Sequence, residues 1–283
     1  MAELWTPEGP DLVVAGDNLD VAARLPAEAF QLIYLDPPFN TGRRQHRTTL
    51  TNVRDPEGAR VGFRGQSYAT VKGRLAGYDD AFADYLEFLA PRLEAAWRLL
   101  HPTGTLYVHL DYREAHYAKV LLDALVGRER FLNEIVWAYD YGARATRRWP
   151  AKHDTILVYV KDPNAYHFDS AAVDREPYMA PGLVTPEKAE RGKLPTDVWW
   201  HTIVSPTGKE KTGYPTQKPL GVLRRIVAAS SRPGDWVLDL FAGSGTLGAA
   251  ALASGRRFVL VDSNPEAIDV MAERFAGCDV RFC

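Results

Sequence analysis

The 283-residue chain has little cysteine, almost no net charge and no long apolar run. Two cysteines near the C-terminal end, Cys278 and Cys283, are too few for a metal site and poorly placed for a structural disulfide. No apolar stretch approaches the roughly 18 residues of a membrane span. The acidic first residues, Met1–Trp5, lack the pattern of a secretory signal. We therefore expect a cytoplasmic protein that is not bound to a membrane.

The net charge of −2 gives no overall sign of nucleic-acid binding, but the basic residues are unevenly distributed. Residues 42–77 hold eight basic side chains, two acidic ones and six glycines without periodicity, which predicts a basic loop. A second basic cluster lies within residues 142–152. Both can be solvated surface, but we favour contact with nucleic-acid phosphates. The candidate residues for this contact are Arg43, Arg44, Arg47, Arg144, Arg147, Arg148 and Lys152.

Short apolar strands alternate with amphipathic helices along the chain, which is typical of an α/β fold with a mostly parallel sheet. The patterns predict seven strands, at residues 11–15, 32–36, 105–110, 134–137, 155–160, 236–240 and 257–261. Residues 161–213 are rich in Pro, Lys, Glu and Gly and show little periodicity. We interpret them as an irregular insertion in one domain that spans residues 1–283.

The stretch from Leu32 to Asn40 is an apolar strand that stops at an acid, two prolines and an aromatic ring. Prolines cannot continue a central strand, so Asp36 is expected at a stiff strand end. A simple turn is the alternative interpretation. The functional one is an acceptor site for a planar amine, in which the Asp36 carboxylate and the Pro37 carbonyl each accept one N–H. Phe39 would then stack on the base that carries the amine.

Residues 243–248 match the pattern G-x-G-x-x-G between a predicted strand and a predicted helix, and Asp262 ends the next predicted strand. This context predicts a site for an adenosine-containing ligand. A dinucleotide is disfavoured because only about 20 residues follow Asp262, too few to complete a dinucleotide-binding domain. Asp239, before the glycines, would repel a pyrophosphate and favour a cationic ligand. S-adenosylmethionine, which carries a sulfonium and an ammonium, fits better than NAD.

Asp36-Pro37-Pro38-Phe39 early in the chain and Phe241-Ala242-Gly243-Ser244-Gly245 late in it resemble the amino-directed DNA methyltransferases in their permuted β-type order. Further segments resemble family motifs in the expected order, including Gly16-Asp17 and the run from Tyr214 to Pro219. The resemblance implies a seven-stranded, Rossmann-like methyltransferase sheet. It also implies methyl transfer from S-adenosylmethionine to adenine N6 or cytosine N4 in double-stranded DNA, with adenine favoured by the acid-first motif.

The resemblance also implies roles for individual residues. The flipped base would be held by Asp36, Pro37, Pro38 and Phe39. The methyl donor would be held by Asp17, Asp36, Lys218, Asp239, Phe241, Ala242, Gly243, Ser244, Gly245 and Asp262. Residues 42–77 and 161–213 would recognise the DNA. The mechanism needs no metal, and His109 and His153 are expected to be ordinary polar residues at strand ends.

Other functions remain open at this point. The same residues suit an RNA methyltransferase, whereas protein-glutamine methyltransferases usually place Asn where this chain has Asp36. A non-catalytic DNA-binding protein is disfavoured because both motifs are intact. A homodimer and a cognate restriction endonuclease are further partners that the resemblance suggests.

Overall fold

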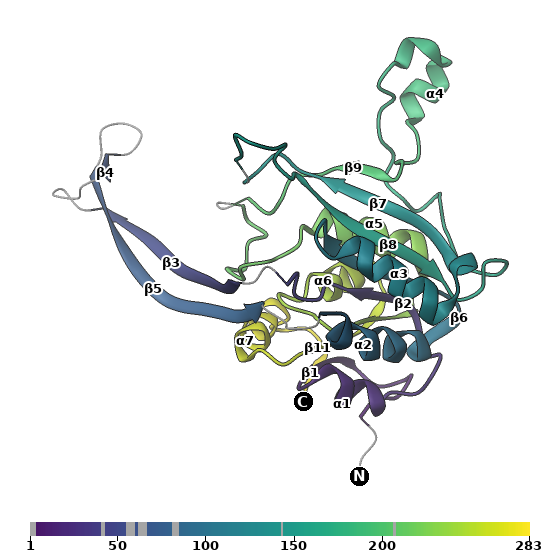
Figure 1. The fold of residues 1–283 in the computed structure, drawn as a ribbon, viewed down its shortest axis with the longest axis horizontal. Helices are drawn as coiled ribbons and strands as arrows, with labels where there is room; N and C mark the ends of the chain where they lie inside the picture. Colours follow the sequence, from purple (N-terminus) through teal and green to yellow (C-terminus); the bar gives the residue numbers. More distant parts are fainter. Residues whose placement is uncertain are drawn as a thin grey trace.

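The computed structural model describes residues 4–40, 43–54, 60–61, 67–80, 85–142, 144–205 and 208–283, with the side chains of residues 43–80 left out of the description. A central sheet with helices on both faces organises these residues (Figure 1). Among them, no helix combines the length and the hydrophobicity that a bilayer span requires.

The sheet contains nine strands in the order β12-β1-β11-β10-β2-β6-β8-β7-β9. Their bounds are β1 Asp11–Ala15, β2 Phe30–Leu35, β6 Leu100–Asp111, β7 Phe131–Ala138, β8 His153–Val160, β9 Val198–Trp200, β10 Trp236–Asp239, β11 Arg257–Asp262 and β12 Val280–Phe282. Within this sheet only β8 runs antiparallel to its neighbours, so the α/β, mostly parallel prediction is confirmed. The predicted number of seven strands is wrong, because β9 and β12 have three residues each and show no readable pattern.

Two sets of helices cover the two faces of the sheet. The first face packs on α1 Asn18–Ala23, α2 Tyr85–Leu99 and α3 Ala115–Val126, and the second on α5 Leu220–Ser230, α6 Thr246–Ala253 and α7 Pro265–Arg274. Strand β2 shows why its sequence is continuously apolar. Ile33 and Leu35 enter the first core while Leu32 and Tyr34 enter the second, so that each position meets a helix layer.

Residues 42–77, predicted as a loop, are largely strand, and the loop prediction is wrong. Strands β3 (Arg43–Arg54) and β5 (Ser67–Asp80) pair antiparallel, with the short β4 (Arg60–Val61) beside β5. Figure 1 shows them as a long ribbon that leaves the body of the molecule. The Arg-, Thr- and Gly-rich sequence lacks an apolar alternation, and backbone pairing alone defines such a ribbon.

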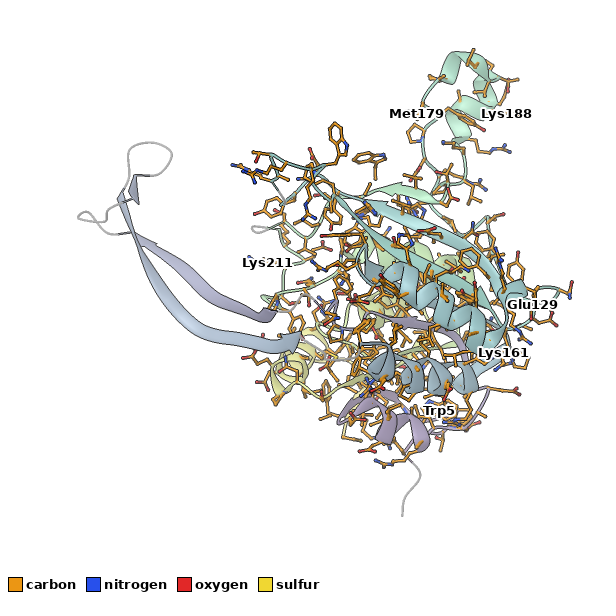
Figure 2. The ribbon with its side chains drawn as sticks, viewed as in Figure 1. Trp5, Glu129, Lys161, Met179, Lys188 and Lys211 are labelled. Atoms are coloured by element: carbon orange, nitrogen blue, oxygen red, sulfur yellow. The ribbon has the colours of Figure 1, made fainter. Side chains whose placement is uncertain are left out.

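The described part of the segment 161–213 is mostly irregular, as predicted, with three short exceptions: the 3-10 helix η2 (Pro181–Leu183), helix α4 (Pro186–Arg191) and strand β9. Helix α4 lies on an arm that is closed at its base by a backbone bridge between Glu176 and Lys193. Figure 2 shows Met179 and Lys188 at the far end of this arm. Strand β9 instead returns to the sheet and pairs with β7.

Gly248 lies where α6 packs tightly against the sheet. A Cβ at this position would lie 2.7 Å from Leu260 Cδ1 and 2.9 Å from Phe275 Cζ. We predict that Gly248→Ala lowers the free energy of unfolding by about 1–3 kcal/mol through overpacking. Denaturant unfolding measures this change. The control is Gly182→Ala, where a Cβ meets nothing within 4 Å, and an equal loss in both variants would contradict the packing argument.

Candidate active site

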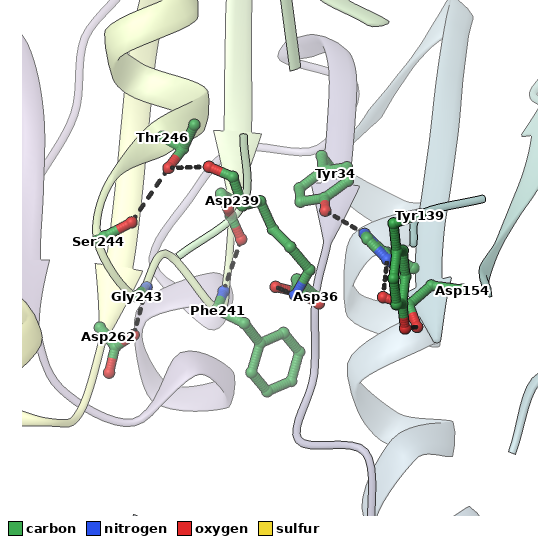
Figure 3. A network of polar contacts seen from close by, with 12 residues as sticks. Tyr34, Asp36, Tyr139, Asp154, Asp239, Phe241, Gly243, Ser244, Thr246 and Asp262 are labelled. Atoms are coloured by element: carbon green, nitrogen blue, oxygen red, sulfur yellow. Dashed lines mark hydrogen bonds and ion pairs between the residues drawn. The ribbon is translucent and has the colours of Figure 1, made fainter. Parts of the chain in front are cut away.

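Three acidic residues stand at the carboxyl ends of three neighbouring strands. Asp36 follows β2, Asp239 ends β10 and Asp262 ends β11, and these strands lie side by side in the order β11-β10-β2. The predicted gathering of these acids at one edge of the sheet is therefore confirmed. Figure 3 shows the three side chains with the polar contacts around them.

A cavity of about 350 Å³ opens beside these acids. Nine of the ten residues predicted to hold the methyl donor line it: Asp17, Asp36, Lys218, Asp239, Phe241, Ala242, Gly243, Ser244 and Asp262. The tenth, Gly245, caps α6 with φ +71°, and a Cβ there would lie 2.8 Å from Met271 Cγ. Gly245 thus serves the packing of α6 on α7 rather than the cavity wall.

The acids shape the glycine turn through backbone hydrogen bonds. The Phe241 N–H donates to Asp239 Oδ1 at 2.8 Å, and the Gly243 N–H donates to Asp262 Oδ2 at 2.7 Å. The Asn264 N–H donates to the other oxygen of Asp262 at 2.8 Å. Gly243 itself has φ +50°, a conformation that favours glycine. The turn is therefore tied to two strand ends by carboxylates.

Burial strongly affects the protonation of these acids. It raises the pKa of Asp239 well above its ordinary value; the Phe241 hydrogen bond opposes the shift, while the charges of Asp36 and Asp262 add to it. Burial also raises the pKa of Asp262 against three backbone hydrogen bonds. A cationic ligand in this cavity would relieve the mutual repulsion of these carboxylates.

Asp36 lies at the boundary of this cavity and holds one oxygen free. Lys218 Nζ donates to Asp36 Oδ2, whereas Asp36 Oδ1 is buried and has no hydrogen-bond partner among the described residues. The same ammonium lies 4.8 Å from the centroid of the Phe39 ring. A buried acceptor without a donor is costly unless a ligand supplies one.

A second cavity, of about 410 Å³, adjoins the first. Its walls include Phe39, Trp137, Tyr139, Tyr141 and Asp154, and it shares Tyr214, Thr216 and Lys218 with the first cavity. The catalytic motif is thus divided between the cavities. Asp36 and Pro38 line the first, Phe39 lines the second, and Pro37 is in neither wall.

Sequence reasoning missed several wall residues. Phe88 and Arg92, one turn apart on α2, line the first cavity, and the Arg92 guanidinium lies 3.9 Å from the Phe88 ring centroid. Arg92 also donates to Asn18 Oδ1 at 2.8 Å and pairs with Asp17 at 3.4 Å. The aromatic–arginine pair at spacing i, i+4 was the available signal. Tyr34, two positions before Asp36, was hidden in the apolar strand.

The predicted DNA contacts have different positions in the structure. Arg144, Arg147 and Arg148 are exposed on the connection between β7 and β8, beside Trp149, which is 95% exposed. Lys152 is half-buried and donates to the Gly142 carbonyl at 3.1 Å. The side chains of Arg43, Arg44 and Arg47 lie outside the described residues, although their backbone belongs to β3.

Comparison with known families decides the nature of the site. Residues 30–274 match the family described as DNA methylase (N6_N4_Mtase). The chain belongs to this family. It is an S-adenosylmethionine-dependent DNA methyltransferase, as the two motifs and the acidic edge of the sheet predict.

Curated relatives align with nearly the whole chain. Type II methyltransferase M.HpaI of Haemophilus parainfluenzae is 30% identical over 93% of this chain and 73% of its own. DNA adenine methyltransferase YhdJ of Escherichia coli K12 is 31% identical over 93% of this chain and 81% of its own.

Solved structures share the fold. The M1.HpyAVI–SAM complex has a TM-score of 0.60 at 20% identity and covers 94% of this chain and 98% of its own. The cytosine-N4-specific PvuII DNA methyltransferase has a TM-score of 0.65 at 15% identity and covers 96% of this chain and 89% of its own.

The residues of the first cavity fit S-adenosylmethionine. Its cationic side chains, Arg92 and Lys218, are each paired with an aspartate, which leaves the lining with an excess of acid. At Gly243, where φ is +50°, a Cβ would lie 3.1 Å from the Tyr214 ring, so a larger residue would crowd the wall of the cavity. This acidic lining suits a ligand that carries positive charge and no phosphate.

Proposed function

We propose that this DNA methyltransferase modifies adenine at N6. The observation that carries the proposal is the unpartnered, buried Oδ1 of Asp36, which can accept an N–H from an exocyclic amine; Asp36 lines the first cavity and pairs with Lys218, a residue that lines both. An acid at this position is commoner in adenine-N6 enzymes of the family. The 31% sequence identity to a DNA adenine methyltransferase supports the same base.

The two cavities suggest a division of roles. The flipped base would occupy the second cavity, with Phe39 against its face and its amine donating to Asp36 and to the Pro37 carbonyl. Extrusion of a base costs a few kcal/mol, which contacts to DNA phosphates can offset. Bound S-adenosylmethionine supplies the activated methyl group. The hydrogen bonds from the amine to Asp36 and to the Pro37 carbonyl would draw the amine nitrogen toward tetrahedral geometry and free its lone pair to attack that methyl group.

In the first cavity we assign the ends of the donor to different residues. Asp17 would lie near its adenine and Asp262 would accept from its ribose hydroxyls. Asp239 would face its positive charge and Lys218 its methionine end. Phe241, Ala242, Gly243 and Ser244 would form the wall between these points.

We further propose that residues 1–283 act as a single catalytic domain in which the ribbon within 42–77 and the insertion 161–213 recognise DNA. The ribbon is built like the two-stranded elements that enter the major groove. Action in the cytoplasm on nucleoid DNA, a homodimer and a cognate restriction endonuclease complete the proposal.

The exposed basic cluster yields a quantitative prediction. Replacing Arg144, Arg147 and Arg148 by Ala should weaken DNA binding and lower the slope of log K against log salt by about 0.9 for each phosphate that the variant no longer neutralises. The control changes three exposed arginines elsewhere, Arg24, Arg128 and Arg232, to Ala. Fluorescence anisotropy between about 50 and 200 mM salt measures both slopes. Equal slopes in the two triple variants would exclude a specific role for the cluster.

The proposed base is tested by methyl transfer from labelled S-adenosylmethionine to genomic DNA of an unmethylated host, followed by nucleoside analysis. Label in N6-methyladenine is the expected result. Label in N4-methylcytosine would keep the donor and the acceptor site but overturn the base. Label on RNA alone would overturn the choice of DNA.

A further inference from the structure

A chain of buried hydrogen bonds links the two cavities behind Asp36. The Tyr34 hydroxyl lies 2.6 Å from His109 Nδ1, and His109 Nε2 lies 3.2 Å from Asp154 Oδ2. The Tyr139 hydroxyl lies 3.0 Å from Asp154 Oδ1. Tyr34, His109 and Asp154 come from the neighbouring strands β2, β6 and β8, Tyr139 directly follows β7, and Figure 3 shows these hydrogen bonds. His109 has no exposed surface, which differs from the expectation of an ordinary strand-end residue.

The chemistry of these groups fixes the direction of the hydrogen bonds. A carboxylate only accepts, so His109 Nε2–H and the Tyr139 hydroxyl both donate to Asp154. In the tautomer that carries its proton on Nε2, the imidazole accepts at Nδ1 from the Tyr34 hydroxyl. Burial raises the pKa of Tyr34, which keeps its proton in place. Burial also acts to raise the pKa of Asp154, but the contacts with His109, the charge of Lys218 and the hydrogen bond from Tyr139 together outweigh it, and the net pKa is lowered.

The residues of this hydrogen-bond chain form part of the walls of both cavities. Tyr34 lines the first cavity, while Asp154 and Tyr139 line the second. The His109 ring also contacts Phe39 at 5.9 Å and Trp137 at 5.5 Å between centroids. Trp137 in turn lies 5.2 Å from Tyr139. The buried imidazole of His109 therefore touches the rings of Phe39 and Trp137 directly. It also reaches Tyr139 through Asp154, which is hydrogen-bonded to both.

We propose that Tyr34 and His109 are positioning residues for the target base, and that Tyr139 and Asp154 form a wall that accepts hydrogen bonds but donates none. Because Tyr139 gives its only hydroxyl proton to Asp154, its oxygen offers lone pairs to the cavity. Such a wall favours a base edge with an amino group and disfavours one with a carbonyl oxygen. The inference rests on the proposed entry of the flipped base into the second cavity.

The fold provides a matched control for the test. Tyr107 is the register partner of Tyr34 on β6, is equally buried and faces the same core. Its hydroxyl bonds Ser230 Oγ at 2.7 Å, and it lines neither cavity of the site. Tyr34→Phe and Tyr107→Phe each remove one buried hydroxyl and one hydrogen bond. Their effects on folding should therefore be similar.

The experiment measures single-turnover methyl transfer to unmethylated genomic DNA at saturating enzyme and cofactor, together with S-adenosylhomocysteine affinity and Tm. Tyr34→Phe should lower the transfer rate by between about 10- and 100-fold, because the base loses its orientation. Because Tyr34 also lines the first cavity, the affinity of this variant for S-adenosylhomocysteine is measured in parallel and should fall by much less than the transfer rate. Tyr107→Phe should transfer at the wild-type rate with a similar change in Tm. Tyr139→Phe, at the other end of the chain, should also slow transfer.

Equal transfer rates in Tyr34→Phe and Tyr107→Phe would overturn the positioning role. A wild-type rate in Tyr139→Phe would overturn the acceptor wall. Failure of the wild-type enzyme to methylate DNA is a different result, since it would remove the proposed function and with it this inference.

Discussion

Asp36→Asn should reduce methyl transfer by at least about 10²–10³-fold while binding of S-adenosylhomocysteine persists. Losing one preorganised polar contact to a reacting group typically costs this much. The amide offers one acceptor oxygen, and its NH2 group faces either Lys218 or the incoming amine, both of which are donors. In the first orientation the contact with Lys218 becomes repulsive and the remaining acceptor carries no charge; in the second the position beside the amine no longer accepts its N–H. Single-turnover transfer and calorimetry with S-adenosylhomocysteine measure the two quantities.

The loss of the ion pair with Lys218 must be separated from the loss of the acceptor. Lys218→Met removes the same ion pair but keeps the carboxylate, so it is the control for Asp36→Asn. If both variants lose the same activity, the ion pair rather than the acceptor is what matters. Undiminished transfer in Asp36→Asn would remove Asp36 from the mechanism.

Asp262→Ala should weaken S-adenosylhomocysteine binding by at least about 100-fold. The substitution removes the proposed acceptor for the ribose hydroxyls. It also releases the N–H groups of Gly243 and Asn264, which hold the turn. Hydrogen bonds to a charged group contribute about 1.5–3 kcal/mol each. The loss of the two proposed bonds from the ribose hydroxyls therefore accounts for a loss of affinity of about 100-fold.

Thermal shift with and without ligand separates binding from folding in this variant. At a ligand concentration of 100 times Kd, the wild type gains about 2.7 kcal/mol. Asp262→Ala should lose most of this gain at the same concentration. An exposed acid nearby in the sequence, Asp279, changed to Ala serves as the control. Retention of wild-type affinity by Asp262→Ala would contradict the assignment of the first cavity.

Much of the fold and of the first cavity could be predicted because the signals are local. Continuous apolar strands followed by an acid place Asp36, Asp239 and Asp262 at one edge of a parallel sheet without knowledge of strand order. The glycine turn is likewise local, since Asp262 holds Gly243 over only 19 positions. The prediction for Gly245 was less good, since the neighbour it packs on, Met271, belongs to a later helix.

The second cavity could not be predicted in the same way. Tyr34 and His109 are 75 positions apart, and His109 and Asp154 are 45 apart. Their meeting depends on which strands pair, and above all on the antiparallel insertion of β8 between β6 and β7. Nothing in the pattern around Asp154 indicates that pairing. The β3–β5 ribbon was missed for a related reason, because cross-strand hydrogen bonds leave no trace in a sequence without apolar alternation.

Among the residues that the structure describes, the two cavities share Tyr214, Thr216 and Lys218 in their walls and no others. Apart from Phe39 and Lys218, the described wall residues of the second cavity lie within 137–154 and 203–217. Of these two ranges, Tyr214 and Thr216 are the described residues that also line the first cavity. Under the proposed division of roles, residues around the base can therefore change while most walls of the donor cavity stay the same. Such a separation would let evolution, or an engineer, exchange the base that the enzyme modifies and keep its methyl source.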